Sequence, residues 1–87
     1  FPDPDFFRPK GFLVRQMASR WGSMTPAGTL VLNKQLVKAP ISTIDYVIIH
    51  ELCHMRHPDH SRDFYGFLSR IMPDWEERKL KLEKVVS

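Results

Sequence analysis

The sequence of 87 residues has little of what usually stabilises or localises a small protein. It contains one cysteine, Cys53, which excludes a disulfide within the chain. Its longest apolar runs, such as residues 47–49, are far shorter than the roughly 20 residues that a membrane-spanning helix needs. The first ten residues contain no apolar segment typical of a secretory signal peptide. We therefore predict a cytoplasmic protein with no membrane partner, since lone cysteines suit a reducing compartment.

Charge of one sign is not in large excess either. The chain has 13 Lys and Arg residues against 10 Asp and Glu residues, which gives a net charge of +3. So small an excess permits an anionic partner such as nucleic acid but does not indicate one. Hydrophobic residues make up 43% of the chain, an ordinary globular value, so we predict one small folded domain. Because the chain begins with Phe1 rather than methionine, we expect it to be a fragment of a longer protein.

The four histidines are the most unusual feature that is present, because all of them lie between positions 50 and 60. A chain of this length buries only about 60–65% of its unfolded surface, so it commonly needs a disulfide, a metal or an oligomer for stability. With a disulfide excluded, the clustered histidines favour a metal.

Two strands are predicted in the first half of the chain. Residues 1–10 contain three prolines and are expected to form an extended lead-in to a single core of residues 11–87. Loose alternation over residues 11–21 suits a strand, although an amphipathic helix also fits it, and residues 29–33 form a second short strand. The turn-rich residues 21–28 between them predict a β-hairpin, against which Trp21 packs.

Three helices are predicted in the second half. Ser42 is the expected N-cap of the first helix, which should end near residue 56 or 57 because Pro58 disfavours helical backbone in the residue before it. His60 or Ser61 opens the second helix, Pro73 ends it, and residues 74–86 form a charged third helix. The expected apolar faces are Ile44, Val47, Ile48, Leu52 and Met55, then Phe64, Phe67, Leu68 and Ile71, then Trp75, Leu82 and Val86.

Residues 50–54 of the first helix read His-Glu-Leu-Cys-His. His50 and His54 lie one turn apart on one helix face, so both imidazoles can reach one metal ion. Glu51 is rotated by about 100° from His50, which places it near the metal without forcing it to be a ligand. This spacing is typical of zinc hydrolases, which need two such ligands and a base for a water molecule.

Either His57 or His60 can supply a third ligand. Pro58 argues against a helix that continues to His57, whereas the bend that follows allows His60 to fold back, so we favour His60. Three protein ligands would leave a fourth position for water, as in a catalytic site. Two alternatives stay open: a structural zinc site with Cys53 or His57 as fourth ligand, and incidental histidines at an exposed helix end. We expect Cys53 to be a small buried hydrophobe rather than a ligand.

The ordered motifs closely resemble the YgjP-like metallopeptidase domain and the related SprT-like and minigluzincin groups. The resemblance covers about residues 14–75 and rests on residues 20–23, 28–33, 36–40, 45–54 and 57–61. It implies an α+β, zincin-like domain in which a β-hairpin or small antiparallel sheet packs on the active-site helix, followed by two further helices. It also implies that His60 is the third ligand, and that family members usually carry a longer N-terminal region.

The hypothesis that follows is a zinc-dependent peptidase that acts on a peptide or protein substrate. Zinc would be bound by His50, His54 and His60, and Glu51 would act as general base. Tyr46 and Tyr65 could stabilise the oxyanion or orient a ligand, and Asp59 and Asp63 could also orient a ligand. The resemblance implies that strand 29–33 is an exposed edge able to pair with an extended peptide.

Two other functions are considered for the same residues. One is a metal-dependent nucleotide phosphohydrolase, an activity linked to the YgjP-like group. The other is a non-catalytic, zinc-stabilised module associated with DNA, by analogy with SprT-like proteins, for which the small net charge gives little support. The sequence predicts neither the substrate nor the oligomeric state.

Overall fold

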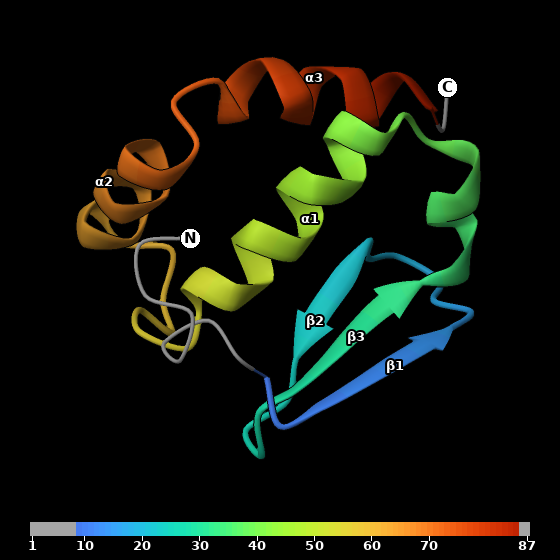
Figure 1. Ribbon diagram of the computed structural model, residues 1–87, viewed down its shortest axis with the longest axis horizontal. Coiled ribbons are helices and arrows are strands. Elements are labelled where there is room, and N and C mark those ends of the chain that lie inside the picture. The colour runs from blue at the N-terminus through green and yellow to red at the C-terminus, as the bar shows by residue number, and fades with distance from the viewer. Residues whose placement is uncertain (1–8, 86–87) are drawn as a thin grey trace.

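The computed structural model describes residues 9–85 of the chain, which form a small α+β domain (Figure 1). The elements in chain order are strands β1 (Gly11–Arg15), β2 (Gly22–Met24) and β3 (Thr29–Asn33), the 3-10 helix η1 (Lys34–Lys38), and helices α1 (Ile41–Cys53), α2 (Arg62–Ile71) and α3 (Trp75–Val85). The predicted α+β architecture, with two helices after the motif helix, is confirmed. Most of the predicted lead-in, residues 1–8, and Val86 lie outside the described residues.

The sheet is mixed, with the strand order β1-β3-β2. Strands β2 and β3 form an antiparallel hairpin, whose turn includes Gly28 at a φ of 93°. Thr25 closes this turn, because its side-chain hydroxyl accepts a hydrogen bond from the Thr29 amide at 3.0 Å. Residues 29–33 therefore do form one strand of a hairpin, but its first strand is β2, in the segment that we expected to be a turn, and not the predicted strand in residues 11–21.

The prediction of one strand over residues 11–21 was wrong, as was a purely antiparallel sheet. Strand β1 ends at Arg15 and pairs parallel to β3, so the chain must cross over before β2 begins. The buried Asn33 side chain stabilises this crossover, because its Nδ2 donates to the carbonyls of Met17 at 3.1 Å and Arg20 at 2.7 Å. Those two carbonyls are thus bound by a side chain instead of a neighbouring strand.

Strand β3 lies in the centre of the sheet, which contradicts the expectation that it is an exposed edge. Its residues Leu30, Val31 and Leu32 are all buried, so it is covered on both faces. The edges are β1 and β2, and α1 packs against β2 and β3. Strand β2 is therefore the edge that lies beside the motif helix.

Helix α1 begins earlier than predicted, because Pro40 and not Ser42 is its N-cap residue. The Pro40 carbonyl accepts hydrogen bonds from the Thr43 amide at 2.9 Å and the Thr43 hydroxyl at 2.7 Å, so a backbone acceptor organises this end. The helix ends at Cys53, and residues 54–56 continue as turns. Met55 is exposed in these turns, contrary to its predicted burial.

Helices α2 and α3 cover the side of α1 that faces away from the sheet (Figure 1). Ser61 is the N-cap of α2, and its hydroxyl accepts a hydrogen bond from the Phe64 amide at 3.3 Å. Of the two predicted first residues, His60 and Ser61, the second is thus confirmed. Arg78 ties α3 to the start of α1, since it donates to Asp74 at 3.1 Å and to the Ser42 carbonyl at 3.1 Å.

The core is built from β3, η1 and the three helices. Its buried members are Leu30, Leu32, Leu36, Tyr46, Val47, Ile49, Leu52, Cys53, Phe64, Leu68, Met72 and Leu82. Cys53 is fully buried and burial raises the pKa of its thiol to about 11, as expected for a structural cysteine. Within residues 9–85, no helix is both long and apolar enough to span a membrane.

Candidate metal centre

Three of the four histidines converge at the end of α1. His50 lies in the last turn of α1, His54 is its C-cap residue, and His60 lies in the loop before α2. The Nε2 atom of His60 is 3.1 Å from Nε2 of His50 and 3.1 Å from Nε2 of His54. In a tetrahedral site with Zn–N bonds of 2.0–2.1 Å, ligand nitrogens are about 3.3 Å apart. The three ring nitrogens, all within 4.8 Å of one another, therefore fit one metal ion.

The chain reversal after α1 brings His60 back to the helix. The amides of Arg56 and His57 both donate to the Cys53 carbonyl, at 3.1 and 3.0 Å, so the helix closes in a tight turn before Pro58. Helix α2 then starts at the Ser61 cap, which leaves His60 beside the end of α1. The bend predicted at Pro58 is thus present.

The Phe64 ring packs against all three imidazole rings from the core side. It is fully buried, and its ring centroid lies 5.0 Å from that of His50, 4.6 Å from that of His54 and 5.1 Å from that of His60. Tyr65 stacks on His60 with centroids 6.2 Å apart, and Trp75 stacks on Tyr65 at 5.3 Å. Aromatic packing therefore holds the exposed His60 ring in place.

The outer nitrogen of each helix histidine has a partner. The Tyr46 hydroxyl lies 3.3 Å from Nδ1 of His50, and the His57 carbonyl lies 3.1 Å from Nδ1 of His54. Burial raises the pKa of Tyr46 to about 12, so its hydroxyl is neutral at pH 7. With a proton on each Nδ1, these oxygens act as acceptors and leave the Nε2 lone pairs facing the centre. The partners are thus a tyrosine and a backbone carbonyl, not Asp59 or Asp63.

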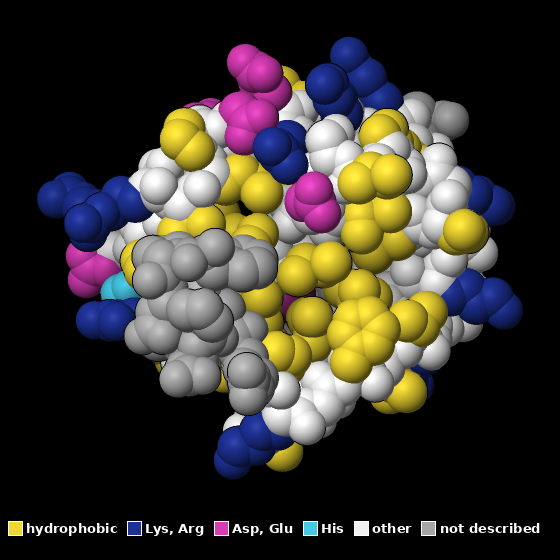
Figure 2. Space-filling view, viewed as in Figure 1, with side chains coloured by type: hydrophobic (Ala, Val, Ile, Leu, Met, Phe, Trp, Pro, Cys, Tyr) yellow, Lys and Arg dark blue, Asp and Glu magenta, His cyan; other side chains and the backbone are white. Residues whose placement is uncertain are grey.

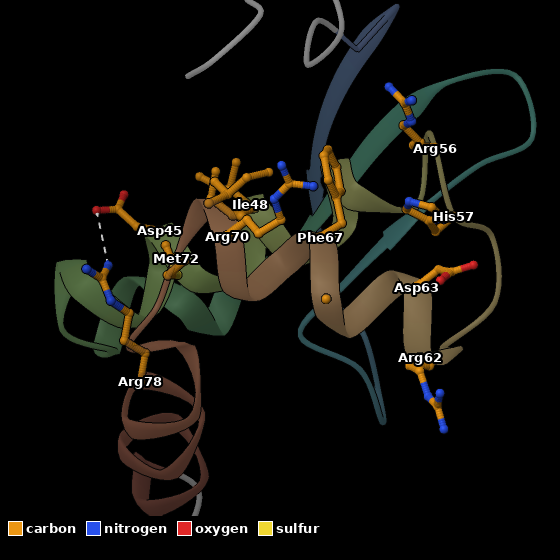
Figure 3. A pocket seen from close by; sticks show the side chains of 13 residues that line it. Asp45, Ile48, Arg56, His57, Arg62, Asp63, Phe67, Arg70, Met72 and Arg78 are labelled. Atoms are coloured by element: carbon orange, nitrogen blue, oxygen red, sulfur yellow. Dashed lines mark ion pairs between the residues drawn. The ribbon is translucent and has the colours of Figure 1, made fainter.

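The His57 ring lies away from the centre. It lines a separate groove of about 1430 Å³ between α1 and α2, where its centroid is 5.4 Å from that of Phe67 (Figure 3). Asp63 also lines this groove, together with arginines such as Arg70. Among the described residues, no set of three metal-ligating side chains converges there. The functional candidate is therefore the smaller cavity on the other side of α1.

That cavity, of about 720 Å³, exposes the three histidines together with Glu51. Burial lowers the pKa of His50 to about 4, and His54 and His60 add to this effect. The His50 ring is therefore neutral at pH 7, which is the state in which imidazole binds a metal. Burial raises the pKa of Glu51, while His54 and Arg20 act in the opposite direction. The arrangement combines the neutral His50 ring with a carboxylate whose pKa is raised.

Sequence reasoning missed four contributors to this site. Arg20 lines the cavity, and its charge acts to lower the pKa of Glu51. Trp21 lines the cavity as well. It also packs against the core, and only this packing was predicted. The supporting role of Phe64 could have been inferred from its place four residues after His60 on an apolar helix face. The role of the His57 carbonyl has no sequence signal, because every residue carries a carbonyl.

Strand β2 approaches α1 so closely that only glycine fits at position 22. A Cβ atom on Gly22 would lie 2.9 Å from Cγ1 of Val47 and 3.1 Å from Cγ of Glu51. We expect Gly22→Ala to reduce the free energy of unfolding by about 1–3 kcal/mol through overpacking, measured by urea denaturation. The matched control is Gly66→Ala in α2, where a Cβ meets nothing within 4 Å, so the free energy should rise by about 0.5–1 kcal/mol. Equal effects of the two substitutions would contradict the close approach.

Comparisons with known proteins identify a family and a similar fold. The family described as YgjP-like, metallopeptidase domain, matches residues 7–85. No curated protein is significantly similar to the chain in sequence. Among solved structures, the crystal structure of the metallopeptidase zymogen of Pyrococcus abyssi abylysin is similar, with a TM-score of 0.78 and 18% sequence identity. The similarity covers 92% of this chain and 84% of that chain, and at this identity it establishes a shared fold.

Proposed function

Because the chain belongs to the YgjP-like metallopeptidase domain family, we propose that it is a zinc-dependent peptidase with zinc bound by His50, His54 and His60. The observation that carries this proposal is the convergence of three imidazole nitrogens beside the Glu51 carboxylate. Imidazole nitrogens suit zinc, and three protein ligands are typical of a catalytic zinc site. The resemblance of the sequence to the family and the proximity of the three imidazoles thus both support these three residues as ligands.

A structural zinc site would need a fourth protein ligand, and the two candidates are Cys53 and His57. Their surroundings disfavour both. The Cys53 side chain is fully buried in the core, and the His57 ring lines the groove on the other side of α1. Zinc held by His50, His54 and His60 would acidify a water molecule and polarise a substrate carbonyl. The cavity at the histidines gives a substrate access to this position.

Glu51 is proposed as the general base. Its carboxylate takes the proton of the attacking water and then transfers it to the amine that leaves when the peptide bond breaks. The raised pKa caused by burial supports this role, because a base works best with a pKa nearer to the working pH. Tyr46 is proposed to orient His50 rather than to stabilise the oxyanion, since its hydroxyl lies at the outer ring nitrogen. Tyr65 is proposed to hold His60 by stacking.

An extended peptide is the proposed substrate, and β2 replaces β3 as the strand that receives it. Gly22, Ser23 and Met24 all line the cavity, and within residues 9–85 β2 is paired with β3 on one side only. The other side of an edge strand presents backbone donors and acceptors that can bind an extended chain. Pairing with β2 would bring a peptide bond alongside the histidines and Glu51.

The test of this proposal is a comparison of substrate classes with the purified, zinc-loaded chain. A peptide library, a panel of nucleoside triphosphates and a DNA duplex are assayed in parallel. We expect peptide cleavage that a chelator removes and added zinc restores. Metal-dependent turnover of nucleotides alone would instead support the phosphohydrolase, and DNA binding without hydrolysis would support a binding module.

The role of Tyr46 gives a further prediction. Tyr46→Phe removes the acceptor of the His50 Nδ1 proton but keeps the aromatic ring in the core. We expect zinc affinity to fall by about 10–100-fold, measured by competition with a chromophoric chelator. The melting temperature of the metal-free protein serves as control and should change much less than that of the zinc-loaded protein. Unchanged zinc affinity would show that the hydroxyl does not orient His50.

A further inference from the structure

Strand β1 forms the sheet edge opposite to the metal centre, and its centre is apolar and exposed. Phe12, Leu13 and Val14 are 61%, 47% and 53% exposed, although they belong to a regular five-residue strand. The strand is well anchored, because β3 pairs with all of it and the Lys10 amide extends the ladder by donating to the Gly28 carbonyl at 2.8 Å. Within residues 9–85, no strand pairs with its outer side.

Both faces of this edge are apolar. The register places Phe12 beside Leu30 and Val14 beside Leu32. Because Leu30 and Leu32 belong to the core beneath α1, the side chains of Phe12 and Val14 lie on the same face of the sheet as α1. Leu13 lies beside Val31 and points to the opposite face. Figure 2 shows apolar side chains gathered in a continuous band over the face on which α1 and the sheet lie side by side. Exposed edge strands are usually protected by a central charge or proline, and β1 has neither among residues 11–14.

We propose that β1 pairs antiparallel with β1 of a second copy of this chain, around a two-fold axis at Leu13, to form one continuous six-stranded sheet. In this register Leu13 faces Leu13 of the partner, and Phe12 faces Val14 on the α1 side in both halves. Aromatic and β-branched residues are among the favourable pairs across strands. Three adjacent apolar pairs would thus be formed along the edge.

The distribution of charge supports a second copy as the occupant. The two charged residues that flank the apolar centre, Lys10 and Arg15, fall opposite Gln16 and Gly11 of the partner, so no like charges meet. A shift of the axis by one residue would place Leu13 opposite either Gly11 or Arg15. The register at Leu13 is therefore the one that pairs apolar groups with each other and keeps both cations apart.

The interface would leave the metal centre accessible in both copies, because β1 and β2 are opposite edges of the sheet. A contact built on five strand residues is small, so we expect reversible association with a Kd on the order of micromolar. The inference does not depend on the peptidase proposal.

Sedimentation of the chain over a range of about 1–500 µM tests the association. We expect a monomer–dimer equilibrium that Leu13→Lys weakens by at least about tenfold, because two ammonium groups would face each other at the axis. Val37→Lys is the matched control, since Val37 is 83% exposed and lies outside the sheet. It should leave the equilibrium unchanged. A wild-type chain that stays monomeric, or equal effects of the two lysines, would overturn the proposal.

Cysteine cross-linking tests the register independently. Leu13→Cys places two thiols opposite each other, and the natural Cys53 is fully buried and should not react. Phe12→Cys is the control, since its thiols would be offset by two residues, beyond disulfide distance. We expect rapid oxidation to a covalent dimer for Leu13→Cys and slow oxidation for Phe12→Cys. Cross-linking at equal rates would exclude this register.

Discussion

Glu51→Gln is expected to lower the rate of peptide hydrolysis by about 10²–10⁴-fold while the protein keeps its zinc. Glutamine has nearly the shape of glutamate, so it can occupy the same half-buried position against Gly22. Its amide oxygen, however, cannot take the proton of the attacking water. The variant should therefore bind substrate and metal but fail in the proton transfer, which would appear in kcat rather than in KM.

Three measurements make this prediction decisive. Zinc content and the melting temperature of the Glu51→Gln variant should match those of the wild type, because Glu51 is not proposed as a ligand. Turnover of a peptide found by library profiling is then compared between the two proteins. If turnover were unchanged, Glu51 would lose its role as base. If zinc were lost together with activity, Glu51 would have to be reassigned as a ligand.

His60→Ala is expected to reduce zinc affinity far more than His57→Ala. His60 contributes an Nε2 atom 3.1 Å from the corresponding atoms of both helix histidines, so its loss leaves two ligands. The reduction should exceed the roughly 10–100-fold that the loss of an orienting partner costs. In contrast, the His57 ring lies in the groove beside Phe67, and its contribution to His54 comes from the backbone carbonyl, which alanine retains.

The pair of variants is matched, because both remove one imidazole from the same loop. Zinc affinity is measured by competition titration, and melting temperatures are compared with and without the metal. Since binding free energy adds to folding free energy, His60→Ala should lower the melting temperature of the zinc-loaded protein most. The opposite ranking of the two variants would make His57 the third ligand.

Those parts of the site that depend on local spacing could be predicted from the sequence. The four-residue interval between His50 and His54 fixes their shared helix face. Pro58 prevents a helix through His57, which agrees with the return of His60 to the helix histidines. The α2 cap at Ser61 is likewise a local signal, because its hydroxyl binds an amide three residues ahead. Such features are encoded within a few residues of the group that they position.

Features that depend on distant contacts could not be predicted. The parallel pairing of β1 with β3 goes together with a crossover stabilised by Asn33, whose side chain binds carbonyls 16 and 13 residues earlier in the chain. Alternation over residues 11–21 gave no sign of that crossover. The start of α1 was misplaced because the helix has no side-chain cap: the Pro40 carbonyl accepts from the Thr43 hydroxyl and from the Thr43 and Ile44 amides. In both cases one partner of the hydrogen bond is a backbone carbonyl, which carries no sequence signal.

The measurement that tests the central claim most directly is the zinc content of the purified wild-type chain, combined with its melting temperature before and after chelation. The proposed centre predicts about one zinc per chain, a lower melting temperature after chelation, and recovery of both values when zinc is added. A fully folded protein that contains no metal and takes up none on titration would contradict the account, because His50, His54 and His60 would then converge without binding the ion that the proposed chemistry requires.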